Sequence, residues 1–246
     1  MRLVRRIGRG LAAGVVTSAV GGVALIALEV VAARTRRYAH TEIGLGVRAT
    51  FGSSGPVVRM VMLGDSSAVG VGVTRVEDTV GGYLAALLAT TGRRVELSTV
   101  GVSGSRSTDL ATQVARALLG GRPDVAVILV GTHDATHLGE AVRRLRDAGA
   151  EVVVGTCPDL GAARAIAPPL RQIVGWLGRR VAAAQAPAVA AVEGVPVDLA
   201  GRTGAVFRAD EGTLCADGFH PSADGYRVWA HALYPAVYEA SRAIAT

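Results

Sequence analysis

Three residues far apart in the chain have the side chains that acyl transfer needs. Ser66 ends a Gly-Asp-Ser sequence that follows the largely apolar run 57–63, and Asp217 precedes His220 by three residues near the C-terminus. A serine hydroxyl becomes a good nucleophile when an imidazole takes its proton, and a carboxylate on the other ring nitrogen fixes the tautomer of that imidazole. Asp217 and His220 are three residues apart and can share one loop. Ser66, His220 and Asp217 are therefore candidates for nucleophile, base and orienting acid.

Two glycine-containing turns supply further candidates. The sequence Gly-Val-Ser-Gly-Ser spans 101–105 and Gly-Thr-His-Asp spans 131–134, and each follows an apolar run. Backbone N–H groups in tight glycine turns can hold an oxyanion. Taken singly, a Gly-Asp-Ser sequence is more often a turn, and Asp-x-x-His before a helix is more often a cap. A catalytic site is favoured by the combination of all four sequences, because a parallel sheet can bring them to one carboxyl edge.

The elements that must position these residues follow from hydrophobic periodicity. Apolar runs that fit buried strands alternate with amphipathic segments that fit helices. The expected strands span 57–63, 95–100, 125–130, 151–156 and 195–199, and the expected helices span 79–90, 109–119, 138–148, 168–186 and 222 onward. This alternation predicts an α/β fold, a three-layer α/β/α sandwich with a five-stranded parallel, flavodoxin-like sheet.

The N-terminus differs in character from the rest of the chain. Residues 11–33 are almost uninterruptedly apolar, with arginines on both sides, which predicts a hydrophobic helix that anchors the protein in the cell membrane by a single pass. The alternative is a cleaved signal peptide. The numbers of arginines on the two flanks are nearly equal, so they do not determine on which side of the membrane the catalytic domain lies. The expected organisation is an anchor with arginine flanks over 1–37, a linker over 38–56 and a catalytic domain over 57–246.

The net charge of +6 belongs to the N-terminus and not to the folded domain. Of the 26 basic residues, all of which are arginine, seven lie in the first 37 positions with one of the 20 acids, so that 19 arginines and 19 acids remain beyond them. A neutral domain with few aromatic residues argues against nucleic acid as a partner. The lack of lysine excludes P-loop and Schiff-base chemistry.

These motifs resemble those of the SGNH (GDSL) hydrolases. The resemblance covers essentially all of the chain after the N-terminal segment. The resemblance implies that Ser66 is the nucleophile, His220 the general base and Asp217 its orienting acid. It also implies that the backbone N–H groups of Ser66 and Gly104 form part of an oxyanion hole. No metal or organic cofactor is implied.

One position departs from the family pattern. The third oxyanion donor of the family is an asparagine side chain, and His133 stands there in this chain. A ring N–H could replace the amide, or the donor could be lost at a cost of about 10²–10³ in kcat. Asp65 and Asp134 are expected to support the site from within their motifs. A metal site formed by His133, Asp134 and His137 is the less favoured alternative because no His-Glu-x-x-His arrangement is present.

The resemblance is to actinobacterial members in particular, because of the segments 100–114, 155–161 and 217–230 and the arginine-, alanine- and glycine-rich composition. It implies an acyltransferase of the octanoyltransferase type, which moves a medium-chain acyl group from an acyl donor to a glucosylglycerate-type sugar or glycoside hydroxyl and also has esterase activity. The alternatives are an exported carboxylesterase or carbohydrate deacetylase, and a membrane-tethered binding module without catalysis.

The two cysteines lie near the expected catalytic edge. Cys157 follows the fourth expected strand, and Cys215 precedes Asp217 by two positions. A disulfide between Cys157 and Cys215 is one possibility if the domain faces an oxidising compartment, and two unpaired thiols are the other.

Overall fold

The computed structural model describes residues 30–31, 38–39, 43, 46–131 and 134–243. No helix within these ranges combines the length and hydropathy that a membrane span requires. The apolar segment 11–33 lies almost entirely outside them, so the anchor stays a prediction, as does the division of the chain at residues 37 and 56.

A six-stranded mixed sheet forms the centre of the fold, with strand order β1-β3-β2-β4-β5-β6. The strands are β1 (Arg48–Phe51), β2 (Val57–Gly64), β3 (Arg94–Thr99), β4 (Val125–Leu129), β5 (Glu151–Gly155) and β6 (Val195–Val197). The strands β2 to β6 are parallel, whereas β1 pairs with β3 in the antiparallel sense. The five predicted strands are confirmed, but the prediction of a five-stranded, entirely parallel sheet is wrong.

The additional strand, β1, lies in the segment that we expected to be a linker. Its four residues alternate between exposed and half-buried positions, so they do not form the continuous apolar run that marks a strand in a parallel sheet. It is an edge strand, and such strands are commonly short and poorly marked in sequence.

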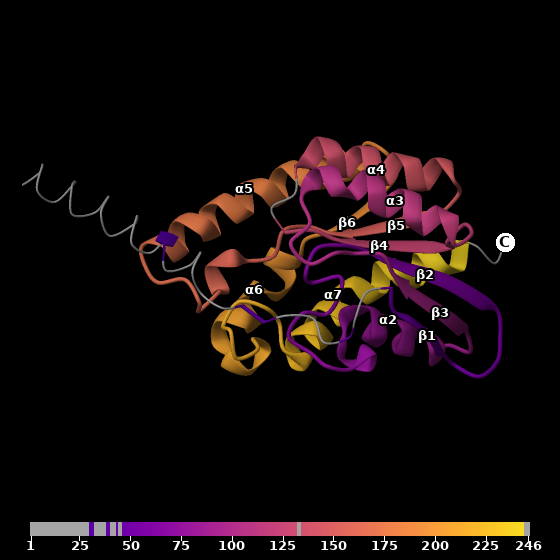
Figure 1. Cartoon of the computed structure of the whole chain (residues 1–246), viewed down its shortest axis with the longest axis horizontal. Coiled ribbons are helices and arrows are strands. Elements are labelled where there is room, and N and C mark those ends of the chain that lie inside the picture. The colour runs from indigo at the N-terminus through magenta and orange to yellow at the C-terminus, as the bar shows by residue number, and fades with distance from the viewer. Residues whose placement is uncertain (1–29, 32–37, 40–42, 44–45, 132–133, 244–246) are drawn as a thin grey trace, which may run out of the picture.

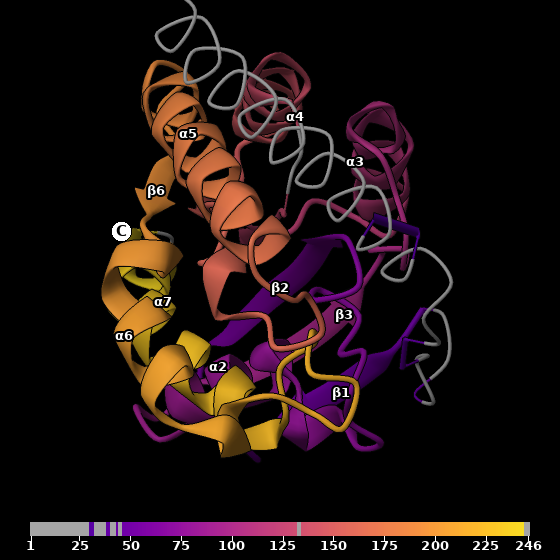
Figure 2. The ribbon, with the colours of Figure 1, turned by 90° about the vertical axis from the view of Figure 1, so that its left-hand side faces the viewer.

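Helices cover both faces of the sheet (Figures 1 and 2). The α-helices are α2 (Val80–Ala89), α3 (Leu110–Leu119), α4 (Ala135–Asp147), α5 (Leu170–Ala190), α6 (Leu199–Ala209) and α7 (Ala223–Arg242). Short 3-10 helices are η1 (Val76–Asp78), η2 (Ser107–Asp109), η3 (Leu160–Ala162) and η4 (Glu211–Thr213). Figure 1 shows α3, α4 and α5 above the sheet and α2, α6 and α7 below it, which is the predicted three-layer arrangement. We had not predicted α6 as a separate helix.

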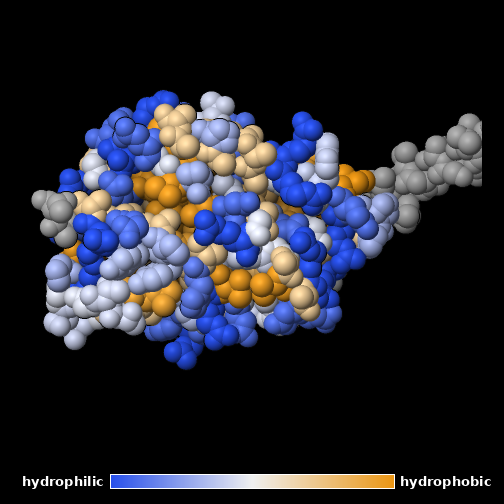
Figure 3. All heavy atoms as spheres, turned by 180° about the vertical axis from the view of Figure 1, so that it is seen from behind, coloured by the Kyte–Doolittle hydropathy of each residue, from blue (hydrophilic) through white to orange (hydrophobic). Residues whose placement is uncertain are grey.

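Two apolar cores hold the three layers together. Met60 and Met62 of β2 point into the core beneath the sheet, whereas Val61 and Leu63 point into the core above it. Every residue of β4 is buried. Because both faces of the sheet are covered, the solvent meets mostly helix surfaces, and hydrophilic side chains predominate there with hydrophobic areas between them (Figure 3).

Candidate active site

Ser66 lies just beyond the carboxyl end of β2, in a turn that a close approach of two strands defines. Gly64 has a φ of +131°, and a Cβ at this position would lie 1.8 Å from the carbonyl oxygen of Leu129. Only glycine fits here. The buried Gln113 side chain accepts from the Gly64 N–H at 2.7 Å and donates to its carbonyl at 2.9 Å. The turn that carries Ser66 is therefore fixed from both sides.

Asp65 joins the ends of two neighbouring strands. Its Oδ1 accepts a hydrogen bond from the Ser67 N–H at 3.0 Å, and its Oδ2 accepts one from the Gly131 N–H at 2.8 Å. The first bond stabilises the turn around Ser66, and the second ties this turn to the loop after β4. In this geometry Asp65 holds the serine turn in place.

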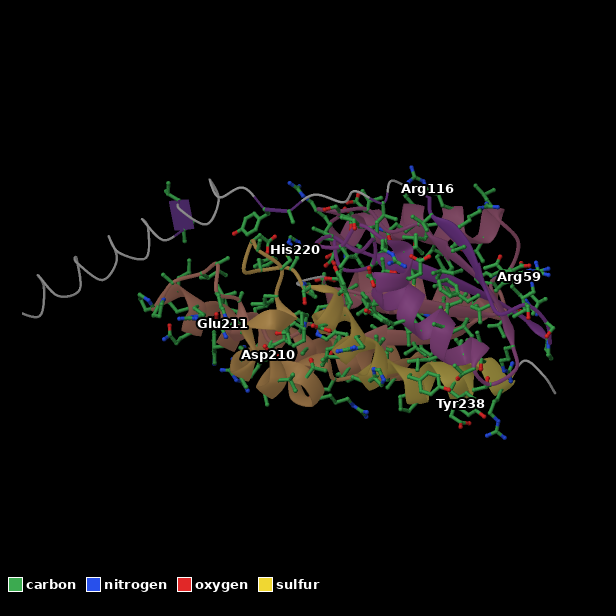
Figure 4. The ribbon with its side chains drawn as sticks, turned by 90° about the horizontal axis from the view of Figure 1, so that it is seen from below. Arg59, Arg116, Asp210, Glu211, His220 and Tyr238 are labelled. Carbon is green, nitrogen blue, oxygen red and sulfur yellow. The ribbon has the colours of Figure 1, made fainter. Side chains whose placement is uncertain are left out.

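Asp217 and His220 share a loop between η4 and α7 that closes on itself. The Cys215 N–H donates to the His220 carbonyl at 2.9 Å, and Gly218 adopts a φ of +69° at the tip. Oδ1 of Asp217 accepts from the N–H groups of Phe219 at 2.7 Å and His220 at 2.9 Å. Figure 4 shows His220 on this loop.

The three residues singled out from the sequence lie in hydrogen-bond contact. His220 Nδ1 is 2.7 Å from Asp217 Oδ2, and His220 Nε2 is 3.1 Å from Ser66 Oγ, although Ser66 and His220 are 154 positions apart. Because a carboxylate only accepts, we assign the ring proton to Nδ1, which leaves the Nε2 lone pair to accept from the serine hydroxyl. The His220 ring is largely buried, which protects this arrangement from water.

The ionisation of Asp217 depends on this network. Burial alone would raise the pKa of the Asp217 carboxyl, but hydrogen bonds from the His220 ring and from the N–H groups of Ala39, His220 and Phe219 outweigh it, and the pKa lies well below its ordinary value. Asp217 is thus an anion at neutral pH, as the assigned tautomer of His220 requires.

We expect Asp217→Asn to destabilise the protein at neutral pH by about 1–3 kcal/mol, because the variant replaces a hydrogen-bonded carboxylate. The folded pKa is depressed, so the stabilisation is present above the unfolded pKa of about 3.9 and is lost as the pH falls through the folded value. Urea unfolding at pH 7 and pH 3 should show a smaller gap between variant and wild type at pH 3. Asp147→Asn, which changes an exposed carboxylate at the end of α4, is the control and should have little effect at either pH. A gap that stays constant with pH would contradict the role of the charge.

A cavity of about 170 Å³ opens beside Ser66 and His220. Its walls come from the turns after β2 and β4, from the loop with η3, from α6, from the loop that carries Asp217 and His220, and from α7. They are mostly apolar, and the larger side chains among them are Leu160, Phe207, Leu214, Phe219 and Trp229. An apolar cavity that reaches a serine hydroxyl can accommodate the hydrocarbon part of an ester.

The turn after β3 lies against the same end of β2. The Val102 N–H donates to the Gly64 carbonyl at 3.1 Å, and Ser105 Oγ donates to the same oxygen at 3.0 Å. Gly104, between them, has a φ of +76°, which glycine adopts without strain. The predicted third oxyanion donor, His133, lies outside the described residues.

Asp134 caps a helix. Its Oδ1 accepts from the N–H groups of Thr136 at 2.8 Å and His137 at 3.2 Å, and its own N–H donates to Ser107 Oγ at 2.7 Å. The backbone hydrogen bond from His137 is the main cause that lowers the pKa of the exposed Asp134 carboxyl. Asp134 therefore fixes the start of α4, three residues earlier than we predicted for this helix.

Both cysteines are free, so the disulfide that we considered is not formed in the structure. Cys215 Sγ contacts Asp217 Oδ1 at 3.2 Å, whereas Cys157 Sγ contacts the carbonyl oxygen of Pro158 at 3.6 Å. Burial, together with the negative charges of Asp65 and Asp159, raises the pKa of the Cys157 thiol to about 12. The two thiols are engaged in separate local contacts.

Sequence reasoning missed several residues that shape the site. Gln113, which holds the Gly64 backbone, is a polar residue on the buried face of α3, flanked there by Leu110, Val114 and Ala117. A lone amide on an apolar helix face was a usable signal, because a buried polar group needs a partner. The Ala39 N–H, which donates to Asp217 Oδ2, had no such signal, because it belongs to the backbone.

The fold and the site together define an α/β protein with a serine, a histidine and an aspartate in contact at the carboxyl edge of its sheet. Residues 62–228 match the model of the GDSL-like lipase/acylhydrolase family, and the chain belongs to this family, as the resemblance predicted. The chain is 42% identical over 196 residues to GDSL-like esterase Rv1075c of Mycobacterium tuberculosis, with 74% of this chain and 62% of that protein covered. The alignment thus spans less than two thirds of the relative's length.

Solved structures share the fold at low sequence identity. The lipase/acylhydrolase from Enterococcus faecalis is 23% identical, with a TM-score of 0.53 over 73% of this chain and 95% of that one. A mutant of Axe2, an acetyl xylan esterase from Geobacillus stearothermophilus, is 18% identical, with a TM-score of 0.52 over 74% of this chain and 94% of that one. At these identities the likeness concerns the fold alone.

Proposed function

We propose that the protein transfers acyl groups from carboxylic esters through a covalent intermediate on Ser66. The observation that carries this proposal is the unbroken hydrogen-bonded series from Asp217 through His220 to Ser66, which ends at the mouth of an apolar cavity. Membership of a family of lipases and acylhydrolases supports it.

The reaction begins when Ser66 Oγ attacks the ester carbonyl carbon and its proton passes to His220 Nε2. Asp217 stabilises the imidazolium that forms, since its carboxylate already accepts from Nδ1. The tetrahedral intermediate collapses, and the leaving alcohol takes the proton from His220. Water or an acceptor hydroxyl then gives a proton to His220 and attacks the acyl-enzyme, and His220 returns this proton to Ser66 Oγ as the acid or the new ester leaves.

The negative charge on the tetrahedral oxygen needs donors. We propose the backbone N–H groups of Ser66 and Gly104, because both belong to turns that are fixed against the Gly64 backbone. A third donor would come from His133 in place of the asparagine of the family. Preorganised donors of this kind act without reorganisation during the reaction.

The size of the cavity favours a short or medium acyl group. A closed apolar cavity of about 150 Å³ is large enough for benzene, which has six carbons. The cavity of about 170 Å³ beside Ser66 is therefore suited to a chain of roughly six to eight carbons. This supports a medium-chain acyl donor. The proposed acceptor, a glucosylglycerate-type hydroxyl, rests on the family resemblance alone.

Filling this cavity should change the preferred chain length. We expect Ala163→Leu, which adds bulk to the cavity wall, to lower the ratio of hexanoyl to acetyl ester hydrolysis about tenfold or more, since each buried methylene contributes about 0.8 kcal/mol. The measurement is kcat/KM for a series of p-nitrophenyl esters. Ala184→Leu, on an exposed position of α5 away from the cavity, is the matched control. An unchanged ratio in Ala163→Leu would show that the acyl chain binds elsewhere.

Incubation with p-nitrophenyl octanoate, with and without glucosylglycerate, tests transfer against hydrolysis. Acylated glycoside supports the transferase, and free octanoic acid alone in both reactions shows an esterase. A carboxylesterase or carbohydrate deacetylase is the second candidate, and the esterase name of the 42% identical relative favours it.

A further inference from the structure

Two residues that precede the sheet in sequence contact the catalytic loop. The Ala39 N–H donates to Asp217 Oδ2 at 3.0 Å, although the two residues are 178 positions apart. The same oxygen accepts from His220 Nδ1 at 2.7 Å.

This contact differs from the other hydrogen bonds of Asp217. Its Oδ1 is held by the N–H groups of Phe219 and His220 and by the Cys215 thiol, all within its own loop. Ala39 instead supplies a donor from another part of the chain, to the oxygen that faces the imidazole. Against burial, which would raise the pKa of Asp217, the Ala39 N–H is one of the donors that lower it.

Tyr38, the neighbour of Ala39 in sequence, contacts the His220 imidazole with its ring. Its ring meets Phe219 edge to face at a centroid distance of 5.3 Å and His220 at 6.2 Å, with 85° between the planes of Tyr38 and His220. Phe219 and His220 are themselves 5.1 Å apart. Such edge-to-face contacts favour one orientation of each ring.

Described residues before and after Tyr38 and Ala39 also pack against the domain. Ile43 packs against the core beneath the sheet, and a Cβ on Gly70 would lie 3.3 Å from its Cδ1. On the other side, Val30 packs against a cluster formed by Ala163, Ile166 and Leu170. Tyr38 and Ala39 are therefore held over the loop by attachments before and after them.

We propose that Tyr38 and Ala39 form a positioning strap that holds the Asp217 carboxylate and the His220 ring in the geometry for proton transfer. This inference rests on the proposed function, because it assigns the strap to the same three residues. The contacts that define the strap are with Asp217, Phe219 and His220, so its residues act through the catalytic loop. Tyr38 and Ala39, which precede the sheet in sequence, are thereby part of the active-site construction.

Ala39→Pro tests the strap directly, because proline has no N–H to donate. We expect kcat for p-nitrophenyl butyrate to fall about tenfold with KM within about twofold, as a hydrogen bond to a charged group is lost without change to the acyl cavity. Ala39→Gly keeps the N–H and is the matched control, with kcat close to that of wild type. Thermal unfolding of all three proteins checks that they are folded.

A backbone substitution keeps the test decisive if proline perturbs folding. Lactic acid in place of Ala39 replaces only the N–H by an ester oxygen, and it should lower kcat as Ala39→Pro does. Proton NMR gives a second readout, because the His220 Nδ1 proton that bonds Asp217 should shift in the N–H-deleted proteins and not in Ala39→Gly.

The outcomes separate the two proposals. If the lactic acid protein or folded Ala39→Pro matches Ala39→Gly in kcat and in the Nδ1 proton shift, the strap has no positioning role. If wild-type protein hydrolyses no ester and forms no adduct on Ser66, the proposed function itself fails, whatever residue 39 does.

Discussion

Ser66→Ala is expected to lower kcat/KM for p-nitrophenyl esters by about 10⁴-fold or more, with thermal stability close to that of wild type. The hydroxyl is the group that forms the bond to the acyl carbon, and no other described hydroxyl accepts from or donates to His220 Nε2. Loss of Oγ leaves only binding and oxyanion stabilisation, which accelerate attack by water far less. Steady-state kinetics on the purified variant give the result.

The neighbouring Ser67 is the matched control for this substitution. Its side chain lines the same cavity, and its N–H rather than its hydroxyl bonds Asp65. Ser67→Ala should therefore retain activity within about threefold of wild type, as expected for a change that leaves the site's hydrogen bonds in place. If Ser66→Ala kept substantial activity while Ser67→Ala lost it, the nucleophile would have been misassigned.

His220→Ala should have an effect of similar size, about 10⁴-fold in kcat, because the serine then has no base and the leaving alcohol no acid. Added imidazole should restore part of the rate, since the vacated space adjoins both Ser66 Oγ and the Asp217 carboxylate. Ester hydrolysis rates of His220→Ala and of its control are measured with and without imidazole.

His231→Ala is the control, because His231 lies exposed on α7 and its ring bonds the Arg227 carbonyl. It should behave like wild type and respond to no added imidazole. An active His220→Ala protein would contradict the assignment of the general base.

Much of the fold could be predicted because the central strands have a clear pattern of apolar residues in the sequence. Strands such as β4, buried along its whole length, leave a continuous apolar run in the sequence. The strand β1 leaves none, because it is an edge strand that pairs with a neighbour on one side only and carries Arg48 and Thr50 at exposed positions. Helix α6 follows β6 after a single residue and contains two glycines. The sequence pattern therefore assigned the first residue of this helix to the preceding strand.

The candidate site could be predicted where chemistry resides in side chains. Ser66, Asp217 and His220 each lie in a short motif, and the parallel sheet brings the motifs to one edge. The contribution of Ala39 could not be predicted, because the donor is a backbone N–H on a residue with an apolar side chain. Every residue except proline carries that donor, so only the three-dimensional path of the chain reveals its use.

Covalent labelling of Ser66 tests the central claim most directly. The wild-type protein is treated with a fluorophosphonate that reacts with activated serines, and the adduct is located by peptide mass spectrometry. We predict one adduct, on Ser66, strongly reduced in His220→Ala and absent in Ser66→Ala. A folded wild-type protein that hydrolyses esters but carries its adduct on another residue, or carries none, would contradict the account.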